Sequence, residues 1–113
     1  MLDKMDKLEK GGVVYRQKCG DCEKVYIGET ERRACERKKE HERDVRQVSM
    51  KSAISEHCHV SGHRPDFASF EIVDVERGWR RRRIKESLHI MKNDTFNRDC
   101  GIGVDKRWRT LVT

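Results

Sequence analysis

The chain has 113 residues, the size of one domain, and 41% of them are charged, with a net charge of +6. Leu, Ile, Val and Phe together make up only about a fifth of the chain, the composition at which chains stop folding on a hydrophobic core alone. A large core is therefore excluded. So is a transmembrane helix, because no apolar run approaches about 18 residues. Met1–Lys10 has no apolar segment, so no secretory signal is expected there.

A core this thin leaves two possibilities, a disordered chain or a small fold with an added staple. A single Pro and regularly spaced hydrophobic clusters argue against disorder. Five Cys are an odd number for a disulfide set, and without a secretory signal the compartment is expected to be reducing. Metal ligation or free thiols are then favoured over disulfides. We predict an intracellular, nuclear protein that is not secreted, and the basic balance favours nucleic acid as partner.

The hydrophobic pattern predicts three strands and three main helices. The expected elements, in chain order, are a short helix at Asp3–Glu9, strands at Gly12–Lys18 and Lys24–Gly28 joined by a turn at Cys19–Cys22, a helix from Thr30 to about Val48, a helix at Ala53–Val60, a strand at Phe67–Glu76 and a helix at Trp79–Asn93. This order, ββααβα, predicts an α+β fold, a small three-stranded antiparallel sheet flanked by helices. We divide the chain into an N-terminal extension (1–11), one domain (12–101) and a C-terminal tail (102–113).

Helix ends and buried faces are also predicted. Thr30 and Ser52 are expected N-caps, and Ser61-Gly62 is expected to end the second helix. The buried faces of the two longer helices are expected to carry Ala34, His41, Val45 and Val48 in the first, and Ile84, Leu88 and Met91 in the last.

Five ordered motifs bear on chemistry. Val13-Val14-Tyr15 ends in a tyrosine that a hairpin places beside the tyrosine of Tyr26-Ile27-Gly28. Arg37 and His41 share one helix face at i and i+4. A helical Glu86 follows, and then Asn97 in Asn97-Arg98-Asp99. Each residue taken alone is most simply structural: packing tyrosines, a surface Arg, a salt-bridging Glu and a loop Asn.

This order of motifs resembles the GIY-YIG nuclease superfamily, over about Gly12 to Gly101. The subgroup it most resembles is the endonuclease domain of Penelope-like retroelements, a class of transposable elements. The supporting strings are GVVYRQKCGDC, VYIGET, SAISEHCHVSGH, RRIKESLHI and FNRDCG. The resemblance implies a metal-dependent DNA endonuclease, a hydrolase of phosphodiester bonds that nicks or cuts.

The resemblance also implies roles for the matching residues. Glu86 would hold one Mg²⁺ or Mn²⁺ through a hard oxygen, and Arg37 would grip the scissile phosphate with its bidentate fork. We expect Tyr15 on the side of the general base and Tyr26 as its partner, although family members are described with either tyrosine nearest the attacking water. His41 would orient a tyrosine or the phosphate. Asn97 would hold the loop near the site.

A second cluster predicts a structural zinc ion. Cys19-x2-Cys22 has zinc-knuckle spacing, and both His57-x5-His63 and His59-x3-His63 fit the usual range for a histidine pair. The alternative for the cysteines is a pair of free or redox thiols. The resemblance implies a Cys2His2 site, for which we assign Cys19, Cys22, His57 and His63, a staple between elements. Cys58 and His59 remain rivals as ligands, whereas Cys35 and Cys100 are expected to be unligated.

A block of arginines predicts how DNA is held. Arg77, Arg80, Arg81, Arg82 and Arg83 would follow the phosphate backbone and give salt-sensitive binding. Trp79 among them is expected in the core or as a cap, with stacking on a base as the other possibility.

Two other functions compete with the nuclease. The first is a zinc-stabilised nucleic-acid-binding domain without catalysis, such as a transposon remnant. The second is a structural or protein-interaction zinc domain, for which the arginine block would be unnecessary. The resemblance also implies that a reverse transcriptase or another targeting domain accompanies this domain in a longer protein. No membrane partner is expected.

Overall fold

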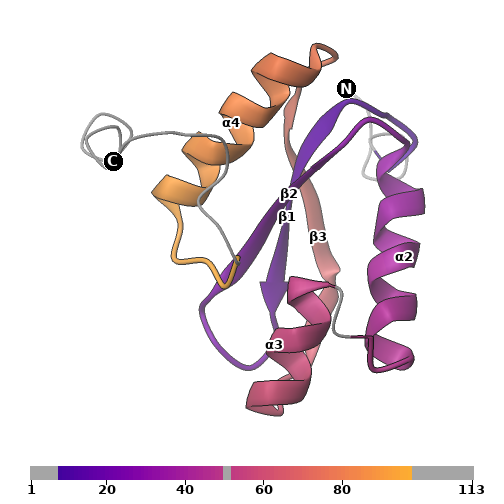
Figure 1. Cartoon of the computed structure of the whole chain (residues 1–113), viewed down its shortest axis with the longest axis vertical. Helices are drawn as coiled ribbons and strands as arrows, with labels where there is room; N and C mark the ends of the chain where they lie inside the picture. Colours follow the sequence, from indigo (N-terminus) through magenta and orange to yellow (C-terminus); the bar gives the residue numbers. More distant parts are fainter. Residues whose placement is uncertain (1–7, 50–51, 98–113) are drawn as a thin grey trace.

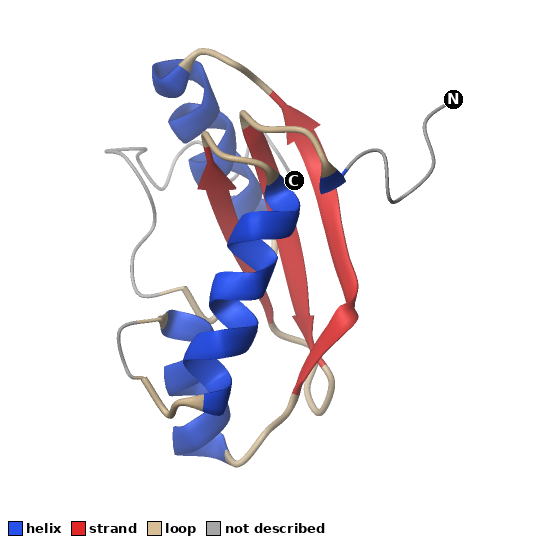
Figure 2. Ribbon diagram, turned by 90° about the vertical axis from the view of Figure 1, so that its right-hand side faces the viewer, coloured by secondary structure: helices blue, strands red, loops and turns tan. Residues whose placement is uncertain are grey.

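The computed structural model describes residues 8–49 and 52–97 of the chain, as a three-stranded antiparallel sheet between helices (Figure 1, Figure 2). The elements in chain order are β1 (Val13–Cys19), β2 (Val25–Thr30), α2 (Ala34–Arg46), α3 (Ala53–Ser61), β3 (Pro65–Val75) and α4 (Trp79–Lys92). The α+β class and the order ββααβα are thereby confirmed. Most of the expected helix at Asp3–Glu9, residues 98–101 and the tail at 102–113 lie outside the described residues.

β1 is the central strand, and the sheet order is β2-β1-β3. Alternate residues of β1 face opposite sides, so the sheet divides the hydrophobic core into two clusters. One cluster holds Val13, Tyr15, Ala34 and Phe70, and the other holds Val14, Val25, Ile27 and Ile90. Figure 1 shows α2 on one side of the sheet and α4 on the other. Both clusters are small, as the composition requires.

The first long helix starts later than expected. Thr30 is not its N-cap, because β2 continues through Thr30, which pairs with Val13. α2 begins at Ala34 after Arg33, whose side chain makes no capping hydrogen bond. At the other end the helix stops at Arg46, and Val48 is exposed with a left-handed φ of 57°. Val48 therefore does not belong to the buried face. Of the residues predicted for that face, Ala34 and His41 are buried.

α3 follows its sequence signals. The Ser52 side chain accepts a hydrogen bond from the Ile54 N–H, as an N-cap does, and Gly62 ends the helix with a left-handed φ of 75°. Figure 1 shows α3 at the end of the molecule where β1 turns into β2. This placement brings the histidines of α3 toward the Cys19–Cys22 turn.

The buried face of α4 differs from the prediction. Ile84 is exposed, whereas Arg82, four residues after the N-cap Gly78, is buried. The Arg82 guanidinium pairs with Glu29 of β2 and donates to the carbonyls of Glu76 and Arg77. These partners compensate for the cost of burying the Arg82 charge. The spacing of apolar residues cannot reveal a buried arginine of this kind. The other buried residues of α4 are Ser87, Ile90 and Met91.

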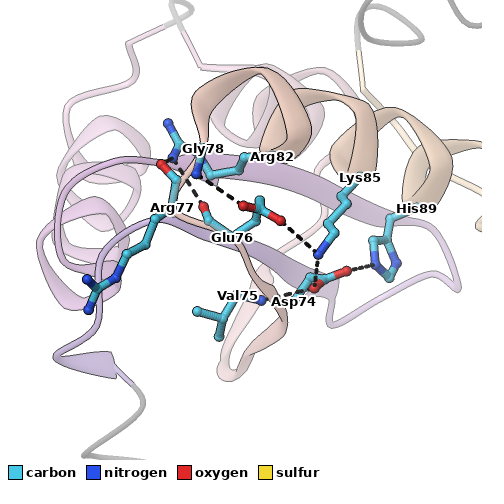
Figure 3. A network of polar contacts seen from close by, with 8 residues as sticks. All are labelled: Asp74, Val75, Glu76, Arg77, Gly78, Arg82, Lys85 and His89. Atoms are coloured by element: carbon cyan, nitrogen blue, oxygen red, sulfur yellow. Dashed lines mark hydrogen bonds and ion pairs between the residues drawn. The ribbon is translucent and has the colours of Figure 1, made fainter.

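A chain of ion pairs fixes α4 against the end of β3 (Figure 3). The Lys85 ammonium lies 3.2 Å from carboxylate oxygens of both Asp74 and Glu76, and His89 Nε2 lies 3.5 Å from Asp74. These groups are partly exposed, so each pair contributes little by itself. Their joint effect is to set the position of α4, which carries Glu86 and the arginine block. Among the described residues, no helix is long and apolar enough to cross a lipid bilayer.

Candidate active site and metal centre

Tyr15 and Tyr26 lie side by side on the α2 face of the sheet, with ring centroids 6.1 Å apart. The ring of His41, from α2, contacts both, at centroid distances of 5.8 Å from Tyr15 and 5.5 Å from Tyr26. Tyr15 is completely buried, while Tyr26 is partly exposed. The two phenols therefore differ in their access to water, although they belong to one aromatic cluster.

Gly28 makes room for the Tyr15 ring. The two residues are opposite each other in the β1–β2 pair. A Cβ atom on Gly28 would stand only 2.4 Å from the Tyr15 Cζ and hydroxyl atoms, closer than any packed atoms come. The φ of Gly28 is not in the left-handed region, so backbone conformation does not require a glycine here. Glycine is required because the Tyr15 ring covers the Gly28 Cα atom and leaves no room for a side chain. The glycine of the second motif is therefore tied directly to the tyrosine of the first.

A hydrogen-bond chain runs inward from Tyr15. The Tyr15 hydroxyl lies 2.8 Å from His41 Nε2, and His41 Nδ1 lies 3.3 Å from Ser52 Oγ. Burial, and then the positive charge of Arg37, lower the pKa of His41 to about 3, so the imidazole is neutral at pH 7. A neutral imidazole donates from one nitrogen and accepts at the other, which suits a chain with Tyr15 at one end and Ser52 at the other.

Arg37 lies against the phenol of Tyr15 from the side of α2. Burial acts to lower the pKa of Arg37, but Tyr15 and Glu40 beside it raise the pKa above its usual value. Its side chain is 29% exposed, and its Nη1 lies 2.8 Å from a carboxylate oxygen of Glu40. Arg37 thus presents a permanent, partly accessible positive charge beside the tyrosines. Arg37 and His41 both reach Tyr15 from α2, so they lie on one face of the helix as predicted.

Glu86 of α4 acts on the same phenol. The pKa of Tyr15 is raised well above its usual value, first by burial, then by Tyr26, and also by the negative charge of Glu86, with Arg37 opposing. The Glu86 carboxylate is therefore within electrostatic range of Tyr15, even though α2 and α4 cover opposite faces of the sheet. Glu86 is partly exposed, so its oxygens are accessible to solvent ions. A carboxylate oxygen is the kind of ligand that Mg²⁺ and Mn²⁺ prefer.

Asn97 fastens the segment after α4 to the open edge of β2. Its carboxamide accepts from the Ile27 N–H at 3.0 Å and donates to the Ile27 carbonyl at 2.6 Å, as a neighbouring strand would. The Val25 N–H donates to the Asp94 carbonyl, and the Phe96 N–H donates to the Val25 carbonyl, along the same edge. The Asn97 side chain therefore holds the loop beside Tyr26, on β2.

Four side chains from three parts of the fold form a separate cluster. Cys19 and Cys22 flank the β1–β2 turn, His57 is on α3, and His63 precedes β3. Their ligating atoms all lie within 4.8 Å of one another, a geometry in which they can hold a metal ion. The sequence assigned these same four residues.

The distances within this cluster fit tetrahedral zinc. Typical Zn–S and Zn–N bonds predict tetrahedral edges of about 3.6 Å between sulfur and nitrogen and about 3.4 Å between two nitrogens. Cys19 Sγ lies 3.6 Å from His63 Nδ1, Cys22 Sγ lies 3.5 Å from His57 Nε2, and the two nitrogens are 3.4 Å apart. Burial, and then His63, lower the pKa of His57, which favours the neutral imidazole that binds metal.

The rival ligands lie elsewhere. Cys58 is buried outside the cluster, and its burial, with the nearby Cys19, raises its thiol pKa to about 11. His59 is exposed, with Nε2 3.1 Å from the Val45 carbonyl. Cys35 Sγ contacts a Glu9 carboxylate at 3.9 Å and takes no part in the cluster. Cys100 lies outside the described residues. On α3, successive residues point about 100° apart, so His57 faces the cluster while Cys58 and His59 do not.

The arginine block divides into one buried and four exposed residues. Arg82 does not belong to a nucleic-acid surface, because it is buried and paired with Glu29. Trp79 is 60% exposed and therefore not in the core as expected. The remaining arginines of the block, Arg77, Arg80, Arg81 and Arg83, are all exposed.

Sequence reasoning missed three residues that shape the site. Ser52 was identified only as a helix cap, although its hydroxyl also contacts His41. Phe96 stacks on His57 at a centroid distance of 4.2 Å and on Tyr26 at 6.0 Å, so it joins the metal cluster to the tyrosines. Gly28 was part of a motif but had no stated contact. No pattern in the sequence signals the first two, because both contacts are made across the fold.

In comparisons with protein-family models, curated proteins and solved structures, none matches this chain.

Proposed function

We propose that this chain is a divalent-metal-dependent endonuclease domain that hydrolyses phosphodiester bonds in DNA, in the manner of the GIY-YIG nucleases and retroelement endonucleases it resembles. One observation carries the proposal: two tyrosines, His41 and Arg37 meet on one face of the sheet, with the Glu86 carboxylate within electrostatic range. The five side chains come from four different elements, so local sequence alone does not account for their meeting.

Arg37 is placed to hold the scissile phosphate. Hydrolysis of a phosphodiester adds negative charge to the phosphate oxygens in the transition state, and a guanidinium stabilises it with two parallel hydrogen bonds. The Arg37 side chain is partly exposed and shares Glu40 with Arg32. A phosphate can replace Glu40 on Arg37 while Arg32 keeps Glu40 in place.

The burial of the tyrosines supports a division of roles opposite to the one expected from the sequence. Tyr26, which is partly exposed, is the phenol that can contact an attacking water, whereas Tyr15 has no exposed surface. A raised pKa also makes Tyr15 a poor phenolate. In this proposal Tyr15 positions Arg37 and His41, and Tyr26 orients the water.

Glu86 would hold the catalytic Mg²⁺ or Mn²⁺. The bound cation would neutralise charge on the phosphate and lower the pKa of its water. The accessible Glu86 carboxylate and the absence of a second carboxylate in its motif suit a cation that keeps several waters.

A second function has its own support. A zinc-stabilised nucleic-acid-binding domain without catalysis needs only the Cys2His2 cluster and the exposed arginines, and complete burial of Tyr15 is also what a packing residue shows. The effect of the Glu86 charge on Tyr15 is the feature this alternative leaves without a role.

Nicking of supercoiled plasmid by zinc-loaded protein with Mg²⁺ or Mn²⁺ tests the choice. We expect metal-dependent nicking, and Glu86→Gln should lower its rate at least about 100-fold, because the carboxylate that holds the cation is lost. DNA binding by this variant should stay within about twofold. The matched control is Glu31→Gln, an exposed carboxylate in the loop before α2, which should nick normally. Absence of nicking by the parent protein would overturn the nuclease in favour of the alternative. Full activity in Glu86→Gln would instead refute the metal-holding role of Glu86.

A further inference from the structure

The start of α4 carries an exposed tryptophan among exposed arginines. Trp79 is 60% exposed, an unusual state for the largest apolar side chain, and two smaller exposed apolar residues lie nearby in the sequence, Val75 and Ile84. Residues 77–81, 83 and 84 are all exposed. We call Arg77, Trp79, Arg80, Arg81 and Arg83 the α4 patch. It combines an open aromatic surface with concentrated positive charge.

The arginines of the α4 patch form no salt bridge in the part of the chain that the structure describes, although the Gly78 N–H and, to a lesser extent, the charge of Arg81 lower the pKa of Glu76. Some other arginines are paired with glutamates, as Arg16 is with Glu71 and Arg33 with Glu36. Within residues 8–49 and 52–97, no ion pair engages an arginine of the α4 patch. The first turn of α4 holds no acidic residue, and its N-cap Gly78 supplies no side chain, so the positive end of the helix dipole adds to the charge. Figure 3 shows the Arg77 side chain directed away from the Glu76–Lys85–Asp74 network.

The α4 patch is aligned with the proposed active site. Trp79, Arg83 and Glu86 follow one another at i, i+4 and i+7, so they lie along one stripe of the helix. Seven residues of helix rise about 10 Å, which is about three nucleotides of a stacked strand at 3.4 Å each. A strand with one phosphate near Glu86 therefore reaches Trp79 with a base a few nucleotides away.

We propose that the α4 patch binds DNA at unpaired bases, with Trp79 stacked on one base and the arginines nearest to it on the helix, Arg80 and Arg83, on the flanking phosphates. An indole stacks only on an exposed base face, and in a duplex both faces are covered by neighbouring pairs. A duplex offers phosphates to the arginines but no open base face to Trp79. Single-stranded DNA offers both. The assignment rests on the proposed function for its DNA partner, and it makes a single-stranded, gapped or branched region the preferred substrate.

Binding without catalytic metal tests the patch separately from nicking. The full zinc-loaded chain is titrated against labelled oligo(dT) of 20 nucleotides, a 20-base-pair duplex and oligo(rU), by fluorescence anisotropy without Mg²⁺ or Mn²⁺. Trp79→Ala should weaken binding to oligo(dT) about 10-fold, the usual loss for one stacked base, and leave the duplex within about twofold. Trp79→Phe should restore most of the affinity. Val60→Ala, a change of an exposed apolar residue on α3, is the control and should bind like the parent.

Arginine variants supply the second arm. Arg83→Gln should weaken binding to both DNA forms and reduce the salt slope by about one, because one phosphate contact is lost. Equal losses of both DNA forms in Trp79→Ala, or unchanged oligo(dT) binding, would overturn the stacking role. Tighter binding to oligo(rU) than to oligo(dT) would overturn DNA as the partner. A protein that passes these tests but never nicks plasmid would refute the nuclease and leave the patch standing.

Discussion

His41 shows how one side chain can serve two elements. It is 1% exposed, it contacts Tyr15 from the core side, and it reaches the residue that caps α3. Replacing either contact would leave a buried imidazole nitrogen without a partner, at a cost of about 1–3 kcal/mol. The same burial that keeps His41 neutral makes it sensitive to acid.

Stability should therefore fall with pH in a window set by His41. Its pKa is about 3 in the folded protein and about 6.5 unfolded, so the unfolded state binds more protons between these values. The contribution of the neutral His41 to the free energy of unfolding is fully present above about pH 6.5. It is lost as the pH falls toward 3, with a slope of up to about 1.4 kcal/mol per pH unit. Urea unfolding of the parent and of His41→Gln at pH 7.5, 5.5 and 4.5 measures it.

The difference between the two proteins isolates the histidine. Acid also protonates the carboxylates of Glu40 and Glu76, whose pKa values are lowered, and these losses are common to both proteins. We expect the stability gap between the parent and His41→Gln to narrow as the pH falls. A gap that stays constant from pH 7.5 to 4.5 would show that His41 is not held neutral by burial.

At the scale of elements, β2 is completed by a side chain. One edge of β2 pairs with β1, and the other is covered by residues 94–97, with the Asn97 carboxamide taking both backbone groups of Ile27. An uncovered strand edge exposes these groups to water and to other strands. Because Phe96 lies within the same segment, its stacks on His57 and Tyr26 depend on this attachment.

Asn97→Ala should destabilise the domain by about 1–3 kcal/mol, because two partly buried backbone groups lose their partner. The control is Asn93→Ala, since the Asn93 side chain donates to the His89 carbonyl within α4 itself and joins no second element among the described residues. It should cost under about 1 kcal/mol. Urea unfolding and amide hydrogen exchange of Ile27 measure the two variants. Equal destabilisation by both variants, with Ile27 still protected in Asn97→Ala, would contradict the attachment.

For the whole molecule, the Cys2His2 cluster joins parts that the small core holds weakly. The cluster links the β1–β2 turn to α3 and to the start of β3. Phe96 stacks on both His57 and Tyr26, so it connects the cluster to the tyrosines. A bound zinc ion adds its binding free energy directly to folding. With two core clusters of four buried residues each, this contribution is a large part of the total.

Loss of zinc should therefore lower the melting temperature substantially. We expect the parent to bind one zinc ion, and Cys19→Ser to bind none and to melt at least about 10 °C lower, since about 1 kcal/mol corresponds to 4–8 °C in a domain of this size. Zinc content and thermal melting are measured on the same preparations. The control is Cys35→Ser, because Cys35 lies on α2 outside the cluster. A Cys19→Ser protein that keeps its zinc and its melting temperature would reject the staple.

Local signals determined those parts of the fold that depend on short stretches of chain. Ser52 and Gly62 at the ends of α3, the alternating strands and the Cys19-x2-Cys22 turn could be predicted because their physics lies within a few residues. The ligand pair His57 and His63 was also predictable from spacing and resemblance, although only the fold separates it from Cys58 and His59.

Only tertiary structure decided what depends on a distant partner. Thr30 is a strand residue because it pairs with Val13 of β1. Arg82 of α4 is buried because Glu29 of β2 provides a carboxylate that pairs with its guanidinium. The sequence by itself therefore determined the order of elements, the basic character and the inventory of chemical groups. The fold decided which charges are neutralised, which aromatic rings are exposed, and which tyrosine reaches water, because burial is a property of the packed chain and not of any single segment.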